Sequence, residues 1–164
     1  MGDTDQETPF SNGTTVHASA LVLGRTGLLI SGPSGSGKST LAAQLIADWK
    51  TQDHYAAWIC DDRVALTVKG HRLLASAPTS ICGMAEMAHV GIVRVNHEPT
   101  GHINGVIRLR PQSEIERMPG QANEDGFGRP VSGLGEPLPA ITLPARQASL
   151  AVTLVRAWLK QNDL

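Results

Sequence analysis

Residues 32–39 read Gly-Pro-Ser-Gly-Ser-Gly-Lys-Ser and match the complete Walker A pattern. An apolar run at residues 28–30 comes directly before this segment, and apolar residues recur every three or four positions after it. A strand that runs into a glycine-rich loop and then into a helix is the context that the motif requires. The segment therefore predicts a phosphate-binding loop in an α/β domain with a mixed sheet and flanking helices.

The residue types in this loop suit a nucleoside triphosphate and a metal ion. Glycines let successive backbone N–H groups turn toward phosphate oxygens, and the helix that begins near Lys38 adds its positive N-terminal dipole. We expect Lys38 to neutralise the β- and γ-phosphates of ATP and the Ser39 hydroxyl to ligate Mg²⁺. The predicted nucleotide-binding residues are Gly32, Pro33, Ser34, Gly35, Ser36, Gly37, Lys38, Ser39 and Thr40.

Two adjacent carboxylates, Asp61 and Asp62, follow the apolar run at residues 55–60. A P-loop enzyme needs a carboxylate beside its Mg²⁺, and a kinase needs one that accepts the proton of the acceptor hydroxyl. Side chains alternate along a strand, but this alternation need not continue beyond its end. The pattern therefore supplies both groups and leaves open which aspartate has which role.

The remaining pattern predicts a single domain over residues 15–164 that follows a disordered tail at residues 1–14. Residues 91–95 and 105–109 are expected to add strands to the sheet, and residues 111–139 form a long surface segment with a short helix at 112–118. The other expected elements are strands at 16–23, 28–30, 55–60 and 140–143, a hairpin of residues 65–68 and 72–75, and helices at 38–50 and 149–161.

Composition argues against several functional classes. The 14 Lys+Arg and 15 Asp+Glu residues leave a net charge of -1, which gives no basic field for nucleic acid. No apolar run approaches the roughly 20 residues that cross a bilayer, and Asp3, Asp5 and Glu7 lie near the N-terminus. We therefore expect a cytoplasmic protein that binds neither nucleic acid nor membrane. Cys60 and Cys82 are expected to be buried free thiols.

Several segments together resemble the catalytic domain of HPr kinase/phosphorylase. The resemblance covers about residues 14–160 and includes Val16-His17, the Walker A loop, Asp61-Asp62-Arg63, Glu-Met-Ala-His-Val-Gly-Ile-Val at 86–93, Glu-Arg-Met-Pro at 116–119 and Leu-Pro-Ala-Ile-Thr-Leu-Pro at 138–144. It implies a phosphoenolpyruvate (PEP) carboxykinase-like P-loop fold, Mg²⁺-ATP as donor, a serine of the phosphocarrier HPr as acceptor, and a hexamer. The resemblance implies a truncated version of the family, which we expect to lack the family's large N-terminal domain.

The resemblance also implies roles for individual residues. His17 matches a histidine near the phosphates, and Asp62 matches the carboxylate that takes the acceptor proton, with Asp61 beside it as a metal-binding or water-positioning group. Glu86 matches a second Mg²⁺ ligand. Arg117 matches a catalytic arginine.

The chain departs from the family pattern at two places. Ala88-His89 stands where the family usually carries Arg-Gly, and Pro-Ala-Arg-Gln-Ala-Ser at 144–149 retains only the first arginine of Pro-Val-Arg-Pro-Gly-Arg-Asn. Phosphorolysis brings two phosphate dianions together and so needs these cations more than the forward reaction does. We therefore expect kinase activity to dominate, with weak or absent phosphorolysis.

Two other functions fit the Walker A loop. A small-molecule P-loop kinase usually closes an arginine-rich lid, but residues 111–139 contain only Arg117 and Arg129. A nucleotide-binding regulator without turnover is favoured by the missing arginine at position 88. ATP consumption with and without HPr separates all three functions.

Overall fold

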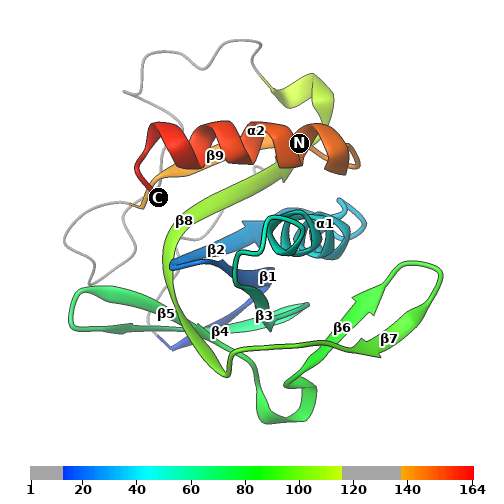
Figure 1. Ribbon diagram of the computed structural model, residues 1–164. Coiled ribbons are helices and arrows are strands. Elements are labelled where there is room, and N and C mark those ends of the chain that lie inside the picture. The colour runs from blue at the N-terminus through cyan, green and yellow to red at the C-terminus, as the bar shows by residue number, and fades with distance from the viewer. Residues whose placement is uncertain (1–12, 116–137) are drawn as a thin grey trace, which may run out of the picture.

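The computed structural model describes residues 13–115 and 138–164, and these form a mixed α/β domain (Figure 1). Two single-turn 3₁₀ helices, η1 (Thr79–Ile81) and η2 (Gln112–Glu114), accompany the longer elements. Along the chain these are β1 (Thr14–Leu23), β2 (Thr26–Ser31), α1 (Lys38–Lys50), β3 (Ala56–Cys60), β4 (Arg63–Lys69), β5 (Arg72–Ser76), β6 (Met84–Met87), β7 (Gly91–Arg94), β8 (Thr100–Arg110), β9 (Ala140–Pro144) and α2 (Ala148–Gln161).

The main sheet has seven strands, and five of them pair in a closed circuit from β2 through β1, β4, β5 and β8 back to β2. β3 pairs with β1 and β9 pairs with β8, outside this circuit. The β2–β8 and β8–β9 pairs are parallel, whereas the other pairs are antiparallel. The predicted mixed sheet is confirmed.

The long strand β1 places the ends of its neighbours β2 and β3 at one edge of the sheet. Its first part pairs with β4, and its second part lies between β2 and β3, both antiparallel to it. β2 and β3 therefore run in the same direction and end at the same edge of the sheet. The glycine-rich loop after β2 and the Asp61-Asp62 pair after β3 both emerge at this edge.

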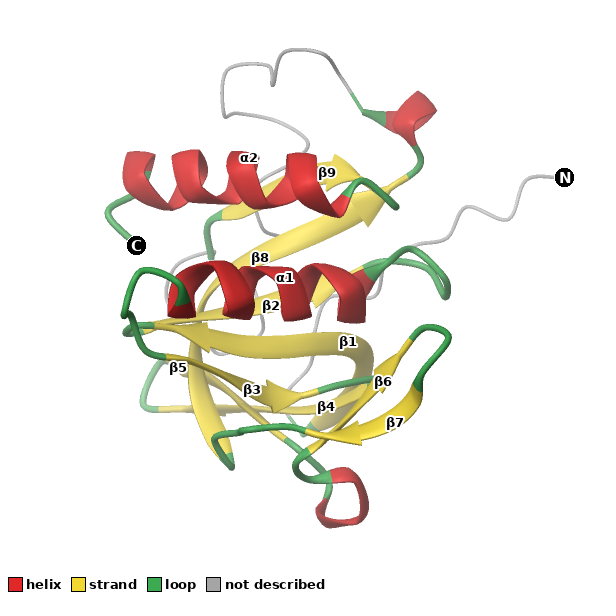
Figure 2. Cartoon of the chain, turned by 45° about the vertical axis from the view of Figure 1, so that its right-hand side comes forward, coloured by secondary structure: helices red, strands yellow, loops and turns green. Residues whose placement is uncertain are grey.

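Both helices lie on the same side of the main sheet, as the two ribbon views show (Figure 2). Apolar residues of α1, α2 and the facing strands form one buried cluster, to which α1 contributes Leu41 and Leu45 and α2 contributes Val155 and Trp158. A second cluster forms on the other face of the sheet around Leu29, Ile59 and Leu66. The helix periodicity in the sequence reflects this one-sided packing.

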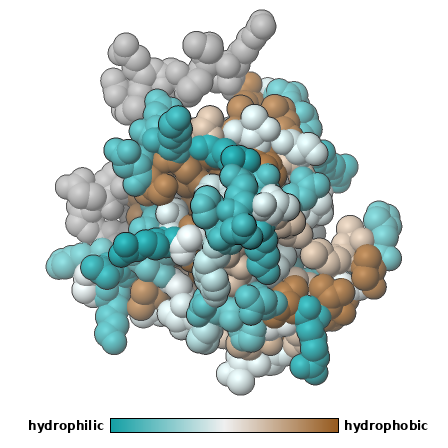
Figure 3. All heavy atoms as spheres, in the orientation of Figure 1, coloured by the Kyte–Doolittle hydropathy of each residue, from teal (hydrophilic) through white to brown (hydrophobic). Residues whose placement is uncertain are grey.

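The predicted incorporation of residues 91–95 into the main sheet is wrong. Among the described strands β7 pairs with β6 alone, in a separate two-stranded sheet that projects from the domain (Figure 1). Val90 and Ile92 are each 74% exposed on this hairpin, so the apolar character of the segment does not indicate burial in the main core. The space-filling view shows apolar surface on the projection (Figure 3).

Some strands and helices begin or end at other residues than the sequence predicts. β1 begins at Thr14, and the Gly13 N–H bonds the Leu66 carbonyl, so residues 13 and 14 of the expected disordered tail belong to the fold, whereas residues 1–12 lie outside the described part of the chain. β8 begins at Thr100, five residues before the predicted strand, because Gly101 lets the backbone lie close to the Ile59 side chain. The predicted helix at 112–118 contains the 3₁₀ turn η2, and its last residues lie outside the described part of the chain. The predicted helices at 38–50 and 149–161 and the predicted hairpin are confirmed.

Replacing Trp158 with Ala should reduce the free energy of unfolding by about 3–5 kcal/mol, because it removes a large side chain from the core between α2 and the sheet. The Trp158 ring lies so close to Gly105 that a Cβ there would be 2.7 Å from Cη2. Urea denaturation followed by circular dichroism measures the change. Leu154→Ala on the same helix is the control, since Leu154 is 36% exposed, and an equal loss in both variants would contradict this packing.

Candidate active site

The loop between β2 and α1 has a backbone that only glycine accommodates at its key positions. Gly32 has φ 153°, and a Cβ there would lie 2.9 Å from the Leu109 carbonyl oxygen and 2.8 Å from the Ser36 hydroxyl. Gly37, at the start of α1, has φ 93° and carries no side chain that could cap the first N–H groups of the helix. The geometry leaves the positive end of α1 available to an anion.

Lys38 folds back across this loop. Its Nζ donates hydrogen bonds to the carbonyl oxygens of Gly32 at 2.9 Å and Pro33 at 3.0 Å, and only 7% of the residue is exposed. Burial lowers the pKa of Lys38, and the negative charges of Asp61 and Asp62 oppose this shift. An anionic group in the loop would favour the charged form of this lysine.

Asp61 is the most highly connected carboxylate of the site. It is 3% exposed and accepts a hydrogen bond from Ser19 Oγ at 2.6 Å and from the Glu86 backbone N–H at 3.0 Å. Ser39 Oγ lies 2.9 Å from both of its carboxylate oxygens. Three separate elements, β1, α1 and β6, therefore converge on one buried side chain at the end of β3.

Asp62 lies in a different environment from its neighbour. Its backbone has φ 68°, a left-handed conformation that aspartate tolerates better than bulkier residues. Its Oδ1 is 2.9 Å from His17 Nε2, and the two side chains are 57% and 49% exposed. The turn at Asp62 therefore separates a buried carboxylate from an accessible carboxylate, a distinction that the sequence left open.

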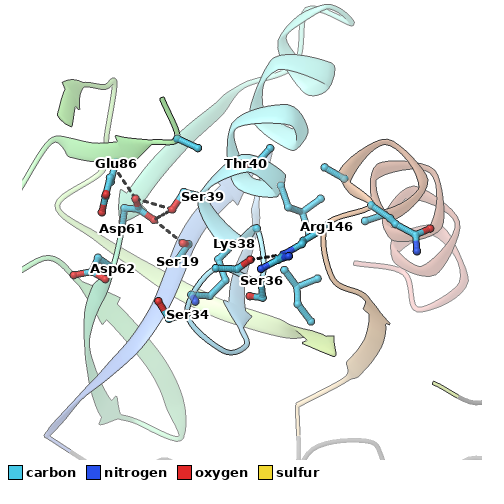
Figure 4. Close-up of a pocket in the computed structure, with 18 of the residues that line it drawn as sticks. Ser19, Ser34, Ser36, Lys38, Ser39, Thr40, Asp61, Asp62, Glu86 and Arg146 are labelled. Carbon is cyan, nitrogen blue, oxygen red and sulfur yellow. Dashed lines mark hydrogen bonds between the residues drawn. The ribbon is translucent and has the colours of Figure 1, made fainter. Parts of the chain in front are cut away.

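These groups line one cavity of about 700 Å³, as the close-up shows (Figure 4). Most of the predicted site residues meet there, whereas Gly32 and Pro33 shape the loop outside the lining and Arg117 lies outside the described residues. The predicted residues that line the cavity are His17, Ser34, Gly35, Ser36, Gly37, Lys38, Ser39, Thr40, Asp61, Asp62 and Glu86.

Sequence reasoning missed Ser19, and it identified Arg146 as a retained arginine without its contact to the glycine-rich loop. Ser19 lies two residues after His17 on β1, so strand alternation alone would have placed both on the same face. Arg146, in the turn between β9 and α2, donates its backbone N–H to the Ser36 carbonyl at 3.0 Å and its Nε to the Gly35 carbonyl at 2.9 Å. This contact between distant segments depends on the tertiary fold, and no local pattern predicts it.

The Ser36 side chain supports a ligand at the loop. Its hydroxyl is buried and has no hydrogen-bond partner among the described residues. Buried hydroxyl groups normally have a partner, and a phosphate oxygen would provide one. The donor set of the loop therefore fits an anion.

Ser39 and the nearby carboxylates fit a magnesium ion. Mg²⁺ prefers oxygen ligands and is usually held by a small number of protein groups together with substrate phosphates. The Ser39 hydroxyl and the Asp61 carboxylate are already in contact, and the Glu86 side chain lines the same cavity.

The two cysteines differ in their surroundings. Burial raises the pKa of Cys60 to about 11, and its thiol donates to the Arg63 carbonyl at 2.7 Å, so this thiol is protonated near neutral pH. Cys82 is half-buried, with Sγ 3.1 Å from His97 Nε2. The expected buried free thiol is confirmed for Cys60.

The family model of the HPr serine kinase C-terminal domain matches residues 8–118. The chain belongs to this family. It is 27% identical over 158 residues to an HPr kinase/phosphorylase of Mycoplasmopsis pulmonis, and this alignment covers 90% of the chain and 48% of that protein. It is 34% identical over 83 residues to an HPr kinase/phosphorylase of Mycoplasma mycoides, and this alignment covers 51% of the chain and 25% of that protein. The chain thus spans about half or less of these curated relatives.

A solved structure supports the same relationship. The HPr(Ser) kinase/phosphatase of Coxiella burnetii superposes with a TM-score of 0.72 at 25% identity, covering 92% of this chain and 99% of that one. The mixed α/β fold is therefore shared with a member of the HPr kinase family. Among the described residues, no helix has the length and apolar character needed to span a bilayer.

Ser39 and Ser19 provide a matched test of the metal site, because each hydroxyl donates to Asp61. Ser39→Ala should reduce the enhancement of ATP binding by Mg²⁺ roughly tenfold or more, since it removes an expected metal ligand. Ser19→Ala should reduce this enhancement less than Ser39→Ala does, because Ser19 is fully buried and supports the site only by orienting Asp61. Calorimetric titrations with and without Mg²⁺ measure both, and equal losses would remove Ser39 from the metal site.

Proposed function

We propose that the protein is an ATP-dependent protein-serine kinase of the HPr kinase type, which transfers the γ-phosphoryl group of ATP to a serine of the phosphocarrier HPr. The observation that carries this proposal is the division of labour between adjacent aspartates in one cavity. Asp61 is buried against Ser39, whereas Asp62 is accessible and paired with His17. An enzyme that transfers a phosphoryl group to a hydroxyl needs one carboxylate beside its Mg²⁺ and another that accepts the hydroxyl proton.

Residues 32–40 bind the phosphates of ATP in this proposal. The N–H groups of the loop and of the first turn of α1 donate to phosphate oxygens, and Lys38 neutralises the β- and γ-phosphates. In the ligand-free geometry Lys38 donates to two loop carbonyls, so it exchanges these neutral acceptors for anionic ones when ATP binds. Burial of Lys38 strengthens its attraction to the phosphates, because an ion pair is less screened away from water.

Ser39, Asp61 and Glu86 are the groups that would hold Mg²⁺. When bound, this ion neutralises charge on the phosphates and helps to orient them for transfer. The chain prepares this function through Ser19 and the Glu86 backbone N–H, which both donate to Asp61 and fix its carboxylate. Such support of a ligand by neighbouring hydrogen bonds is a general feature of metal sites.

Asp62 acts as the general base. The acceptor serine oxygen bonds to the γ-phosphorus, the bond between that phosphorus and the β–γ bridging oxygen breaks, and ADP leaves with the bridging electron pair. Asp62 accepts the proton of the serine hydroxyl, and His17 orients this carboxylate through its 2.9 Å contact. The exposure of Asp62 at the cavity leaves it accessible to a protein acceptor, whereas Asp61 is enclosed.

The remaining assignments come from family membership and sequence. We include in the proposal a PEP carboxykinase-like P-loop domain over residues 15–164, a hexamer, and action in the cytoplasm. Arg117 is proposed as an additional catalytic arginine. HPr is the proposed acceptor because the relatives carry its name.

Asp62→Asn should lower the rate of phosphoserine formation on HPr by about 10²-fold or more, the usual scale for loss of a general base. ATP binding should be retained, because asparagine has the same shape and also tolerates the φ of 68° at this position. The rate is followed with labelled ATP and the affinity by calorimetry. Asp61→Asn is the comparison and should instead weaken Mg²⁺-ATP binding, so loss of rate with intact binding in Asp61→Asn alone would reverse the assignment.

The same cavity should favour the kinase direction. Ala88, His89, Gln147 and Ala148 line it at the two places where the sequence lacks family arginines. Phosphorolysis brings inorganic phosphate against an anionic phosphoserine, so it loses more from missing cations than transfer to a neutral hydroxyl does. We expect pyrophosphate release from Ser-phosphorylated HPr and millimolar phosphate, without ATP, to be far slower than the forward reaction. Comparable rates would refute this directionality.

A further inference from the structure

The cavity extends to a second wall across the glycine-rich loop from the carboxylates. This wall comes from the ends of β8 and β9 and the first turns of α2, and its lining residues are Leu109, Pro144, Arg146, Gln147, Ala148 and Ala151. The close-up shows Arg146 on one side of Lys38 and the labelled acids Asp61, Asp62 and Glu86 on the other (Figure 4). The loop thus lies between two chemically different surfaces.

The two walls have opposite character. The first wall carries three carboxylates, whereas Arg146 is the charged residue that the second wall contributes among the described lining residues. The rest of the second wall is apolar or uncharged, and α2 contributes the small side chains of Ala148 and Ala151 to it. An apolar surface with few polar groups suits an aromatic ring system better than a phosphate chain.

The direction of the nucleotide follows if the proposed function holds, on which this inference rests. The γ-phosphate must face Asp62 for transfer, and the β-phosphate lies at the loop. The triphosphate of ATP is an unbranched chain, so with its γ end at the carboxylates we expect its nucleoside end on the other side of the loop. That side is the second wall.

Arg146 is held in place at this wall. Its Nε bonds the Gly35 carbonyl at 2.9 Å, its backbone N–H bonds the Ser36 carbonyl at 3.0 Å, and its φ is 59°. A guanidinium group is planar and stacks readily on aromatic rings. Because the loop fixes one edge of this group, less conformational entropy is lost when a ring stacks on it.

Gln147 lies at the rim of the same wall. Its Nε2 donates to Gln112 Oε1 at 3.0 Å, which connects the start of α2 to the turn after β8. Ala148 is half-buried as the first residue of α2, and Ala151 is 1% exposed one turn later. A ring that stacks on Arg146 would therefore contact small side chains of α2.

We infer that the second wall is the nucleoside-binding subsite, in which the base of ATP stacks on the Arg146 guanidinium and packs against Ala148 and Ala151. Inorganic tripolyphosphate carries the same three phosphates without a nucleoside. It should therefore depend on the glycine-rich loop and be insensitive to changes in this wall.

The test compares ATP and inorganic tripolyphosphate, each with Mg²⁺, by calorimetric titration of the full chain. Ala148→Leu places a larger side chain in the subsite and should weaken ATP binding on the order of tenfold, as expected when a base-stacking contact is lost. Tripolyphosphate affinity should stay within about twofold. Ala157→Leu makes the same change at an exposed position of α2 and should affect neither ligand.

Arg146→Lys is the second variant, which decides the question if Ala148→Leu does not fold. It keeps the positive charge but removes the planar group, so ATP should weaken several-fold more than tripolyphosphate. Unchanged ATP affinity in a folded Ala148→Leu protein, or equal loss of both ligands in either variant, would overturn this inference alone. Failure of the wild-type chain to bind ATP at all would overturn the proposed function together with it.

Discussion

The hydrogen bonds that converge on the buried Asp61 carboxylate organise the rest of the site. Ser19 from β1, Ser39 from α1 and the backbone N–H of Glu86 from β6 all donate to it. An unpaired carboxylate in this position would carry a large desolvation cost, so these partners must be in place when the chain folds. This requirement ties the projecting hairpin, the first strand and the helix after the glycine-rich loop to one point.

That constraint also explains how neighbouring aspartates acquire different surroundings. The buried position of Asp61 and the left-handed turn at Asp62 direct the second carboxylate to the accessible surface, where it meets His17. The glycine-rich loop begins at the sheet edge where Asp61 lies, because β2 and β3 both run antiparallel to β1. Sheet topology therefore brings a cationic loop and a pair of carboxylates together without any local sequence signal that links them.

Much of the fold could be predicted because the local signals agree with the tertiary structure. The helix at Lys38–Lys50 has a one-sided apolar pattern and begins at a recognisable motif. The hairpin of β6 and β7 could not be assigned, since its apolar residues Val90 and Ile92 are exposed and its two strands pair with each other instead of joining the main sheet. The carboxylates and the loop were predictable as residue types, but their division into buried and accessible groups required the backbone geometry at Asp62.

The most direct test of the account is transfer of label from ATP to HPr. Wild-type protein and Lys38→Ala are incubated with γ-labelled ATP, Mg²⁺ and HPr from the same source, and the labelled residue is identified. Because Lys38 is the buried cation of the loop, the account predicts phosphoserine on HPr with the wild type and none above background with the variant. Absence of label on HPr with the wild type, or equal labelling by Lys38→Ala, would contradict it.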